Sequence, residues 1–558
     1  MKVSQLPYER FDCVKGAKDI YECVDGIKRA NNVEEVIAWH DKAVEIVSHF
    51  STMASLANMR FTLNTFDEFY LKEKTYYDEQ SPEFSLAYNE IGKAMLQSKF
   101  IDELKRKLNP LIFEKYRIME ASSDPRIVED KQKEAAICVE YNQLMSGMSF
   151  EFKGKEMPLS VLRGYFGSSD REERKAACIA LGKGLAEHKA ELDDIYDRLV
   201  KVRDAQAKKL GFDNYVKLGY LNMERMDYDR DMVEQFRRNV VEKLVPVICK
   251  LKEEIKNKLD IDEFMFYDDA VSFVDGEPKP KLDKEGIFKA AQEAYDEMDE
   301  EIGKFMRSMQ EDEAFDVDSR KGKWGGGYCT NFSDFKQTFI LANFNGSSDD
   351  IDVVTHEFGH ALAMNYAFDG DPELFIGGNE TAECHSMSME FLAWPFMDKF
   401  FDEPQKYKFK HLMSSLSFIP YGCIVDEFQH IVYENPQLTP KERNEVYLKL
   451  EHKYRPYLSF SGLPYLEEGT RWQYQMHIFE NPFYYIDYCL AQTIALSFLV
   501  ASRYDYKDAL RRYKEFAEKG GRVPFGRLCK EAGFLSPFEK GALDKVAAEI
   551  PQILKELN

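Results

Sequence analysis

The sequence predicts a mainly α-helical protein with one short β-rich segment. From about Val33 to His188, apolar residues recur every three or four positions almost without interruption, which is the spacing of amphipathic helices. Further helical patterns run from Glu191 to about Asn257 and from Lys284 to about Gln310. The β-rich run Gln337–Phe344 is short beside them. With 558 residues, the chain can form several cores or one large multi-lobed domain.

Turn signals such as Asn109-Pro110 and Ser122–Pro125 divide the N-terminal part into successive helices. Three histidines, His40, His49 and His188, lie on separate helices here. None of them has a second ligand four residues further on. We therefore interpret each as a core or surface histidine.

The run Gln337–Phe344 is predicted to be a strand that directly precedes the most informative stretch of the chain. If it is an edge strand, its free N–H and C=O groups could pair with an extended peptide. If it is paired on both sides, they could not. The sequence leaves both alternatives open.

A proline-free segment, Asp350–Phe368, has apolar residues at helical spacing, and the helix is predicted to begin near Ser348. His356 and His360 are four positions apart, so they share one face and can bind one metal ion together. Glu357 lies about 100° round the helix from His356. Two imidazole ligands beside a carboxylate that takes a proton from the metal-bound water form a zinc hydrolase arrangement. The alternative is a surface helix with two histidines, and a third ligand decides between them.

A second helix, predicted over Glu380–Trp394, offers candidates for the third ligand. Three acids lie on one of its faces: Glu380, Glu383 and Glu390. His385 is about 200° from Glu383 on a helix, so it cannot share the ion with that carboxylate. Spacing alone does not choose between the acids, because Asn379-Glu380 also suits a thermolysin-like pattern.

The two segments together resemble the paired motif of the thimet oligopeptidase and oligoendopeptidase F family of zinc metallopeptidases. In that family the ligand glutamate is followed by Ser three residues later and by Glu seven residues later, as Glu383 is by Ser386 and Glu390. The resemblance implies that Glu380 and Glu390 orient other groups or serve the structure. It implies one zinc ion, held by His356, His360 and Glu383.

The region His477–Gln492 gathers Tyr and His side chains, which are neutral donors suited to an oxyanion. It is similar to the family's substrate-binding segment, which implies that His477 and Tyr488 are the donors. Tyr485 lies one helical turn before Tyr488 on the same face. Without the resemblance these aromatic residues would be interpreted as core packing, and three tyrosines compete for the role.

The resemblance spans roughly residues 190 to 558 and fits the oligoendopeptidase F branch best. It implies a mainly α, two-lobed helical ellipsoid with a deep central channel and a small β-sheet beside the zinc helix. Such a channel admits unfolded oligopeptides and excludes folded proteins. We expect residues 1–190 to form a helical N-terminal region and residues 191–558 to form the catalytic domain, which contributes to both lobes.

The function expected from these residues is that of a zinc-dependent endopeptidase, which hydrolyses internal bonds of short unfolded oligopeptides. A zinc-bound water activated by Glu357 would attack the peptide carbonyl. The alternatives are a catalytically inactive peptide-binding protein and a dipeptide-releasing carboxypeptidase of the same motif class. The intact set of His356, Glu357, His360 and Glu383 argues against the inactive protein, since a decayed enzyme is expected to lose Glu357 first.

Composition narrows the partners and the compartment. A net charge of −23 argues against nucleic acid and anionic membranes, which need a basic footprint. The expected oligopeptide partners are what the resemblance implies. The ten cysteines form no C-x-x-C pair, which is typical of free thiols in a reducing compartment. The N-terminus lacks the apolar core of a signal peptide, and no run of 18 apolar residues occurs. We therefore expect a cytoplasmic protein; the sequence gives no oligomeric state.

Overall fold

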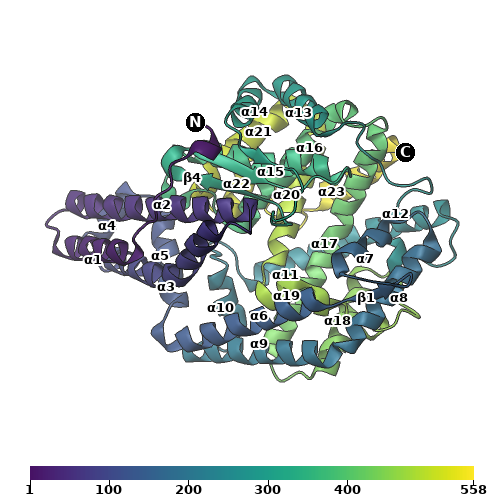
Figure 1. The fold of residues 1–558 in the computed structure, drawn as a ribbon, viewed down its shortest axis with the longest axis horizontal. Coiled ribbons are helices and arrows are strands. Elements are labelled where there is room, and N and C mark those ends of the chain that lie inside the picture. The colour runs from purple at the N-terminus through teal and green to yellow at the C-terminus, as the bar shows by residue number, and fades with distance from the viewer. The chain divides into compact units, whose positions relative to one another are not determined.

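A computed structural model describes all 558 residues, and it is mainly helical as the sequence predicts. The strands are short and form two small sheets, one of two strands and one of three. Figure 1 shows helices along the whole chain, from α1 to α23. The predicted mainly α fold with a small sheet is confirmed.

The chain forms two compact units, each assembled from segments far apart in the sequence. Unit 1 comprises Met1–Ser122, Lys279–Pro404 and Ala501–Phe534, and unit 2 comprises Ser123–Pro278, Gln405–Val500 and Leu535–Asn558. The boundary predicted at residue 190 falls inside α9 (Lys189–Lys209). The division into a helical region and a catalytic domain at this residue stays a prediction, and so does the channel.

Unit 1 contains an N-terminal helical bundle, the three-stranded sheet and further helices, of which α2 and α15 contact the sheet. Its elements are α1 (Cys13–Arg29), α2 (Val33–Leu63), α3 (Glu68–Leu96), α4 (Ile101–Lys107), α5 (Pro110–Ser122), α13 (Lys284–Met298), α14 (Glu300–Glu311), β3 (Phe315–Asp316), β4 (Tyr328–Phe332), β5 (Gln337–Leu341), α15 (Asp349–Ala367), α16 (Asn379–Leu392), α21 (Tyr506–Lys519) and α22 (Phe525–Glu531).

Unit 2 is helical apart from one β-hairpin. Its elements are α6 (Val128–Gly147), β1 (Phe150–Phe152), β2 (Lys155–Met157), α7 (Leu159–Gly164), α8 (Arg171–Glu187), α9, α10 (Tyr215–Asn222), α11 (Arg230–Asn239), α12 (Val245–Lys258), α17 (Pro404–Glu434), α18 (Pro440–Tyr454), α19 (Met476–Glu480), α20 (Tyr485–Tyr504) and α23 (Asp544–Leu557). The last turn of α20, from Ala501, is assigned to unit 1.

The predicted strand is the central strand of the unit 1 sheet. β5 pairs in parallel with β3 on one side and antiparallel with β4 on the other, in the order β3-β5-β4. The edge-strand alternative is therefore wrong for this segment, since β4 pairs with all five residues of β5 on one side and β3 pairs with Ile340 and Leu341 on the other. Residues Thr338–Leu341 are all buried, as expected for a strand covered on both faces.

Helices α13 and α14 pack against the face of α15 that carries Phe358. The Tyr295 hydroxyl donates a hydrogen bond to the Val354 carbonyl oxygen at 2.8 Å. Its ring lies 4.2 Å from the fully buried ring of Phe358, and the Phe305 ring lies on the same side at 5.7 Å. These contacts bury the face of α15 that carries Phe358, so the face that carries the histidines is held in one orientation.

Helix α20 is long and apolar enough to cross a membrane by composition alone, with a mean hydropathy of 1.3 over an 18-residue window. However, 78% of that window is buried inside the structure. This is the position of a core helix in a globular protein.

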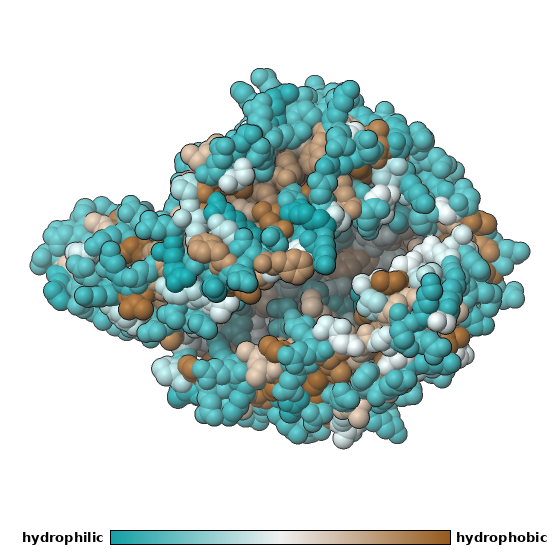
Figure 2. All heavy atoms as spheres, in the orientation of Figure 1, coloured by the Kyte–Doolittle hydropathy of each residue, from teal (hydrophilic) through white to brown (hydrophobic).

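The surface is mainly hydrophilic, as expected for a chain in which 31% of the residues are charged. On the face drawn in Figure 2, hydrophilic side chains predominate and the hydrophobic ones lie in small groups between them.

All ten cysteines are free thiols, and seven of them are buried. No disulfide framework holds the fold, as the scattered cysteines predict.

Candidate metal centre

The helix that carries the two histidines begins where the sequence predicts. Ser348 is the N-cap of α15, and the Ser347 Oγ accepts a hydrogen bond from the Asp349 backbone N–H at 3.2 Å. The carboxylate of Asp350 accepts hydrogen bonds from two backbone N–H groups of the preceding loop. Acidic groups in the first turn also interact favourably with the helix dipole.

His356 and His360 lie side by side on α15, with ring centroids 5.0 Å apart. The Oε2 atom of Glu383 lies 3.5 Å from Nε2 of His356 and 3.7 Å from Nε2 of His360. One potential ligand atom from each of these three residues falls within 4.8 Å of the others. Two imidazole nitrogens and a carboxylate oxygen at this spacing fit a zinc ion, which prefers such donors in tetrahedral sites.

The close packing of α15 against α16, which brings Glu383 to the imidazoles, depends on a glycine. A Cβ atom added at Gly359 would lie 2.7 Å from the carbonyl oxygen of His385 and equally close to the Cα of Ser386. Both are backbone atoms of α16, so they could not move aside without moving the helix. Gly359, between the two histidines, therefore allows the two ligand-bearing helices to touch.

The structure groups Glu383, and not Glu380, with the two histidines. Both carboxylates are more than 90% buried. Glu383 also accepts a hydrogen bond from the Ser386 hydroxyl at 3.2 Å, whereas the carboxylate of Glu380 lies against Thr381 and the backbone of Gly378. Burial alone would raise the pKa of Glu383, but its hydrogen bond to His356 and the nearby His360 hold that pKa below its usual value.

Glu390, the third acid, orients one of the histidines. Its Oε1 atom accepts a hydrogen bond from Nδ1 of His356 at 2.6 Å. Burial opposes the charged imidazole, yet the contacts with Glu383 and Glu390 raise the pKa of His356 well above its usual value. With Nδ1 committed to Glu390, Nε2 is the nitrogen left for a metal, as in other carboxylate–histidine–zinc triads. His360 lacks such a second carboxylate, and burial lowers its pKa to about 4.

Glu357 projects from α15 into surroundings with little polar contact. The structure records no hydrogen bond for its carboxylate, and burial raises its pKa, against the opposing effect of His356. Its neighbour on β4 is the half-buried Cys329, and burial together with Glu357 raises the pKa of the Cys329 thiol well above its usual value. A carboxylate with a raised pKa beside a metal-ligand set is suited to accept and return a proton.

His385 stays outside the metal-ligand group, as its angle on the helix predicts. Its side chain is 1% exposed, and neither ring nitrogen has a hydrogen-bond partner. Burial lowers its pKa to about 3, so the ring is neutral. It packs edge-on against Phe516 with centroids 5.5 Å apart, which is a structural role.

The residues predicted to be oxyanion donors form a second cluster, in unit 2. The His477 ring at the start of α19 lies 4.9 Å from the Tyr485 ring and 6.3 Å from the Tyr488 ring, centroid to centroid. Tyr485 and Tyr488 lie 5.9 Å apart on one face of α20. The Tyr488 hydroxyl donates a hydrogen bond to the Tyr484 hydroxyl at 2.9 Å. The predicted donors therefore come together with one another within their own unit.

A strained residue sets the turn into α20. Phe483 has a φ of 68°, in the left-handed region that non-glycine residues rarely adopt. Its backbone N–H donates to Oε1 of Gln429 at 2.7 Å, and its carbonyl oxygen accepts from Nη2 of Arg225 at 2.5 Å. Arg225 also pairs with Asp487, at 2.8 Å. These buried contacts fix the turn that orients the tyrosines.

Sequence reasoning missed two neighbours of His477. Nδ1 of His477 accepts a hydrogen bond from the side chain of Gln475, which in turn accepts one from the hydroxyl of Tyr421 on α17. Gln475 lies only two residues before His477, so the sequence could have indicated that the two side chains lie close together. Tyr421 is distant along the chain, and no periodicity links it to His477.

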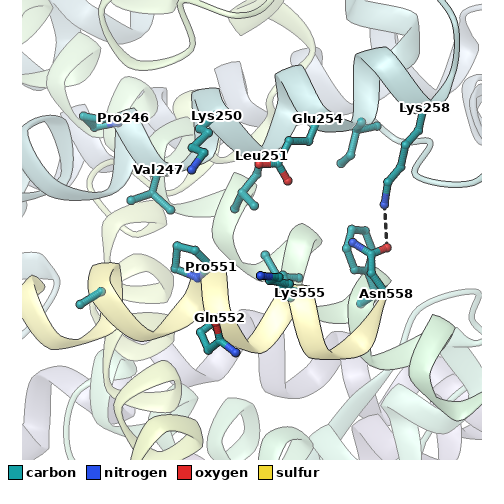
Figure 3. A pocket seen from close by; sticks show the side chains of 14 residues that line it. Pro246, Val247, Lys250, Leu251, Glu254, Lys258, Pro551, Gln552, Lys555 and Asn558 are labelled. Atoms are coloured by element: carbon teal, nitrogen blue, oxygen red, sulfur yellow. Dashed lines mark hydrogen bonds between the residues drawn. The ribbon is translucent and has the colours of Figure 1, made fainter.

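A separate groove of about 750 Å³ lies between α12 and α23 in unit 2 (Figure 3). Leu251, Ile255, Pro551 and Leu554 line it, together with three lysines and Glu254. Nζ of Lys258 donates a hydrogen bond to Oδ1 of Asn558 at 2.7 Å across one end. None of the predicted catalytic residues lines this groove.

Comparisons with known proteins find similarity along most of the chain. Residues 3–121 match the family model described as the peptidase M3 N-terminal domain, and residues 165–548 match that of peptidase family M3. Oligopeptidase PepF of Bacillus subtilis (strain 168) is 22% identical over 563 aligned residues, which cover 90% of this chain and 77% of that protein. The chromosomal oligoendopeptidase F of Lactococcus lactis subsp. cremoris is 24% identical, over 65% of this chain and 62% of that protein.

A solved structure of PZ peptidase A with an inhibitor has the same fold. It superimposes with a TM-score of 0.92 and 40% sequence identity, over 100% of this chain and 99% of that chain.

Proposed function

This chain belongs to peptidase family M3, and from that premise we propose that it is a zinc-dependent endopeptidase acting on internal bonds of short unfolded oligopeptides. The observation that carries the proposal is the convergence of His356, His360 and Glu383, with ligand atoms within 4.8 Å of one another. Glu357 lies on α15 with the two histidines, directly after His356.

The metal would be held by Nε2 of His356, Nε2 of His360 and the carboxylate of Glu383. When bound, zinc acts as a Lewis acid that lowers the pKa of water and polarises a carbonyl oxygen. Glu390 keeps the His356 ring oriented through Nδ1, at 2.6 Å. Cobalt and manganese also bind such donors, so that the ion is zinc is itself part of what we propose.

Glu357 is proposed as the general base and then the general acid. It would take a proton from the attacking water and pass that proton to the leaving amine. The raised pKa of Glu357 supports both steps, because a carboxylate that holds its proton more tightly can also deliver it.

His477 and Tyr488 are proposed to donate hydrogen bonds to the oxyanion, with Tyr485 supporting them. Burial lowers the pKa of His477, so its ring is neutral near pH 7. Burial and the nearby Tyr421 raise the pKa of Tyr485 far above neutrality, so its phenol keeps its proton. Neutral donors stabilise a developing negative charge without forming a fixed ion pair with the substrate in its ground state.

The names of the relatives favour internal cleavage of peptides over release of C-terminal dipeptides. One is described as an oligopeptidase and one as an oligoendopeptidase. We also propose a cytoplasmic location, which the ten free thiols support. Oligopeptides are the proposed partners, and the charge of −23 disfavours nucleic acid and anionic membranes.

The proposal is tested with peptides of graded length, each with free or blocked ends, digested with and without a chelator and analysed by mass spectrometry. An endopeptidase cleaves blocked peptides at internal bonds, and the chelator abolishes that cleavage. Exclusive release of C-terminal dipeptides from free-ended peptides would instead support the carboxypeptidase.

The role of Glu357 is tested in the same assay with Glu357→Gln. This variant is expected to keep its zinc, measured by elemental analysis, and to lose most of its activity. Full turnover in the zinc-loaded variant would overturn the assignment of the base, and no turnover by the zinc-loaded wild type would favour a peptide-binding protein.

A further inference from the structure

We propose that Gln475 is a positioning residue that holds His477 in the neutral tautomer with its proton on Nε2, and that Tyr421 fixes the orientation of the Gln475 amide. This inference rests on the proposed function, because it concerns how a donor of the same site is kept ready to donate. It adds two residues to which the sequence motifs assign no role.

The first step is the chain of contacts. The Tyr421 hydroxyl lies 2.5 Å from Oε1 of Gln475 and donates to it. The other end of the amide, Nε2 of Gln475, lies 3.0 Å from Nδ1 of His477. An amide nitrogen carries two N–H donors and accepts nothing, so Nδ1 of His477 has to be the acceptor.

The second step is the consequence for the ring. A neutral imidazole has one N–H, so a ring that accepts at Nδ1 carries its proton on Nε2. The structure records no hydrogen bond for Nε2 of His477. Its ring neighbours are the phenols of Tyr484, Tyr485 and Tyr488, and no carboxylate pairs with it. The free N–H is therefore available to an incoming acceptor, such as the oxygen of a substrate carbonyl.

The third step explains why the amide does not flip. In the reverse orientation the amide N–H would face the Tyr421 oxygen, and Nδ1 of His477 would have to be protonated. The guanidinium carbon of Arg471 lies 3.8 Å from the centroid of the Tyr421 ring, and that of Arg455 lies 5.2 Å away. Two cations over the ring withdraw electron density from it. They make the phenol a better donor and a poorer acceptor, which favours the orientation seen.

The experiment replaces Gln475 by glutamate, which has the same size and is an acceptor only. A carboxylate beside Nδ1 accepts a proton from it and raises the pKa of the imidazole. Below that pKa the imidazolium still donates from Nε2. Above it, the remaining proton sits on Nδ1 and Nε2 becomes an acceptor. In Gln475→Glu, kcat should therefore fall as the pH rises through this pKa, by about 10²-fold, as expected for one lost oxyanion donor.

Wild type should lack this step, because its Nε2 stays protonated across the same range, and KM should change much less than kcat. The control Gln132→Glu adds the same charge on an exposed position of α6 and should keep the wild-type profile. An identical pH profile in Gln475→Glu and wild type would overturn the role of Gln475.

The tautomer is read directly by NMR of protein labelled with ¹⁵N-histidine, in which the ¹⁵N shifts separate protonated from unprotonated ring nitrogens. His477 is identified by the signal lost in His477→Asn. The expected wild-type pattern is protonated Nε2 with unprotonated Nδ1, and Tyr421→Phe should add a second population with protonated Nδ1. Protonated Nδ1 in wild type would overturn the proposal, and a single unchanged tautomer in Tyr421→Phe would overturn the part assigned to Tyr421.

This readout does not depend on turnover. If His477→Asn keeps full activity, His477 is not a donor in catalysis, although the tautomer set by Gln475 can still be as proposed. The two failures are thus distinguishable.

Discussion

At the scale of single residues, Glu380 and Glu383 lie less than one helical turn apart on α16. Measuring the zinc content of variants shows which of the two is the metal ligand. Glu383→Gln should lose most of its zinc, because a neutral amide oxygen replaces a carboxylate ligand. The metal is measured by elemental analysis after dialysis against metal-free buffer. The matched control, Glu380→Gln, removes a charge from the same helix and should keep one zinc per chain. The reverse pattern would make Glu380 the ligand.

Glu390 offers a second test, because it would act on a bound metal only through His356. Glu390→Leu removes the acceptor at 2.6 Å from Nδ1 and should weaken zinc affinity by about 10- to 100-fold. Competition with a chromophoric chelator measures the change. Wild-type affinity in a folded Glu390→Leu variant would contradict a role in orienting the ligand.

The sequence could predict part of this site because part of its geometry is local. His356 and His360 share a face through helical geometry alone, and the structure places them 5.0 Å apart. Which acid of α16 faces them depends on how two helices pack, so spacing left Glu380 and Glu383 open. The resemblance favoured Glu383, which the structure groups with the imidazoles. Tyr421 reaches His477 through Gln475 only because distant segments of the chain pack together, and no pattern in the sequence predicts that contact.

At the scale of elements, the packing of α15 on α16 can be tested at Gly359. Gly359→Ala places a methyl group 2.7 Å from backbone atoms of α16, so the helices must separate. Overpacking of this kind costs about 1 to 3 kcal/mol in unfolding free energy, and zinc affinity should fall as Glu383 moves away. Thermal unfolding and the chelator assay measure both effects.

The control for Gly359→Ala is Gly147→Ala at the end of α6, where an added Cβ meets no atom within 4 Å. It should leave the melting temperature within about a degree of wild type. Equal behaviour of the two variants would contradict the close helix contact.

A second element-scale prediction concerns the segment that joins α15 to α16. Within unit 1, the side chain of Glu373 in this segment is 6% exposed and lies beside His40 of α2, with Oε2 2.8 Å from Nε2. The Tyr116 hydroxyl donates to Oε1 of Glu373 at 2.6 Å. Burial lowers the pKa of His40, but the hydrogen bond to Glu373 outweighs it and the pKa is raised. The histidine thus stabilises the fold fully below its unfolded pKa of about 6.5, and this stability is lost as pH rises through the folded pKa.

The melting temperature of wild type should therefore fall as the pH rises from 6 through the folded pKa of His40, relative to that of His40→Gln. The control His452→Gln changes an exposed histidine and should keep the wild-type dependence. Parallel curves for wild type and His40→Gln would contradict the ion pair. His40, which the sequence left as a core or surface residue, is thus a buried partner of a distant loop.

The sequence predicted where helices and strands begin and end more accurately than it predicted which of them pack together. The helix predicted to begin near Ser348 begins at Asp349. The strand predicted over Gln337–Phe344 is β5, but its two neighbours were not predictable. One of them, β3, contributes only Phe315 and Asp316, which is too short for a period-2 pattern.

At the scale of the whole molecule, helical periodicity predicted the fold class, whereas the division into units escaped it. Periodicity describes each helix by itself, and the units arise because the chain returns to a unit it has left. Residues 279–404 join the N-terminal 122 residues in unit 1, although unit 2 segments intervene. No local composition change marks such a return, so a single boundary near residue 190 was the simplest prediction.

Metal removal tests how far the metal centre stabilises the whole chain. Both ligand helices, α15 and α16, belong to unit 1, and zinc that binds only the folded state stabilises it by RT ln(1 + [Zn]/Kd), about 2.7 kcal/mol at 100 times Kd. A chelator should therefore lower the melting temperature of wild type by a few degrees, and added zinc should restore it. Glu383→Gln should show much smaller shifts, because it is expected to hold little zinc. A melting temperature that is the same for zinc-loaded and metal-free wild type, with the metal content checked by elemental analysis, would mean that zinc does not bind the folded chain in preference to the unfolded one, and would contradict the proposed site.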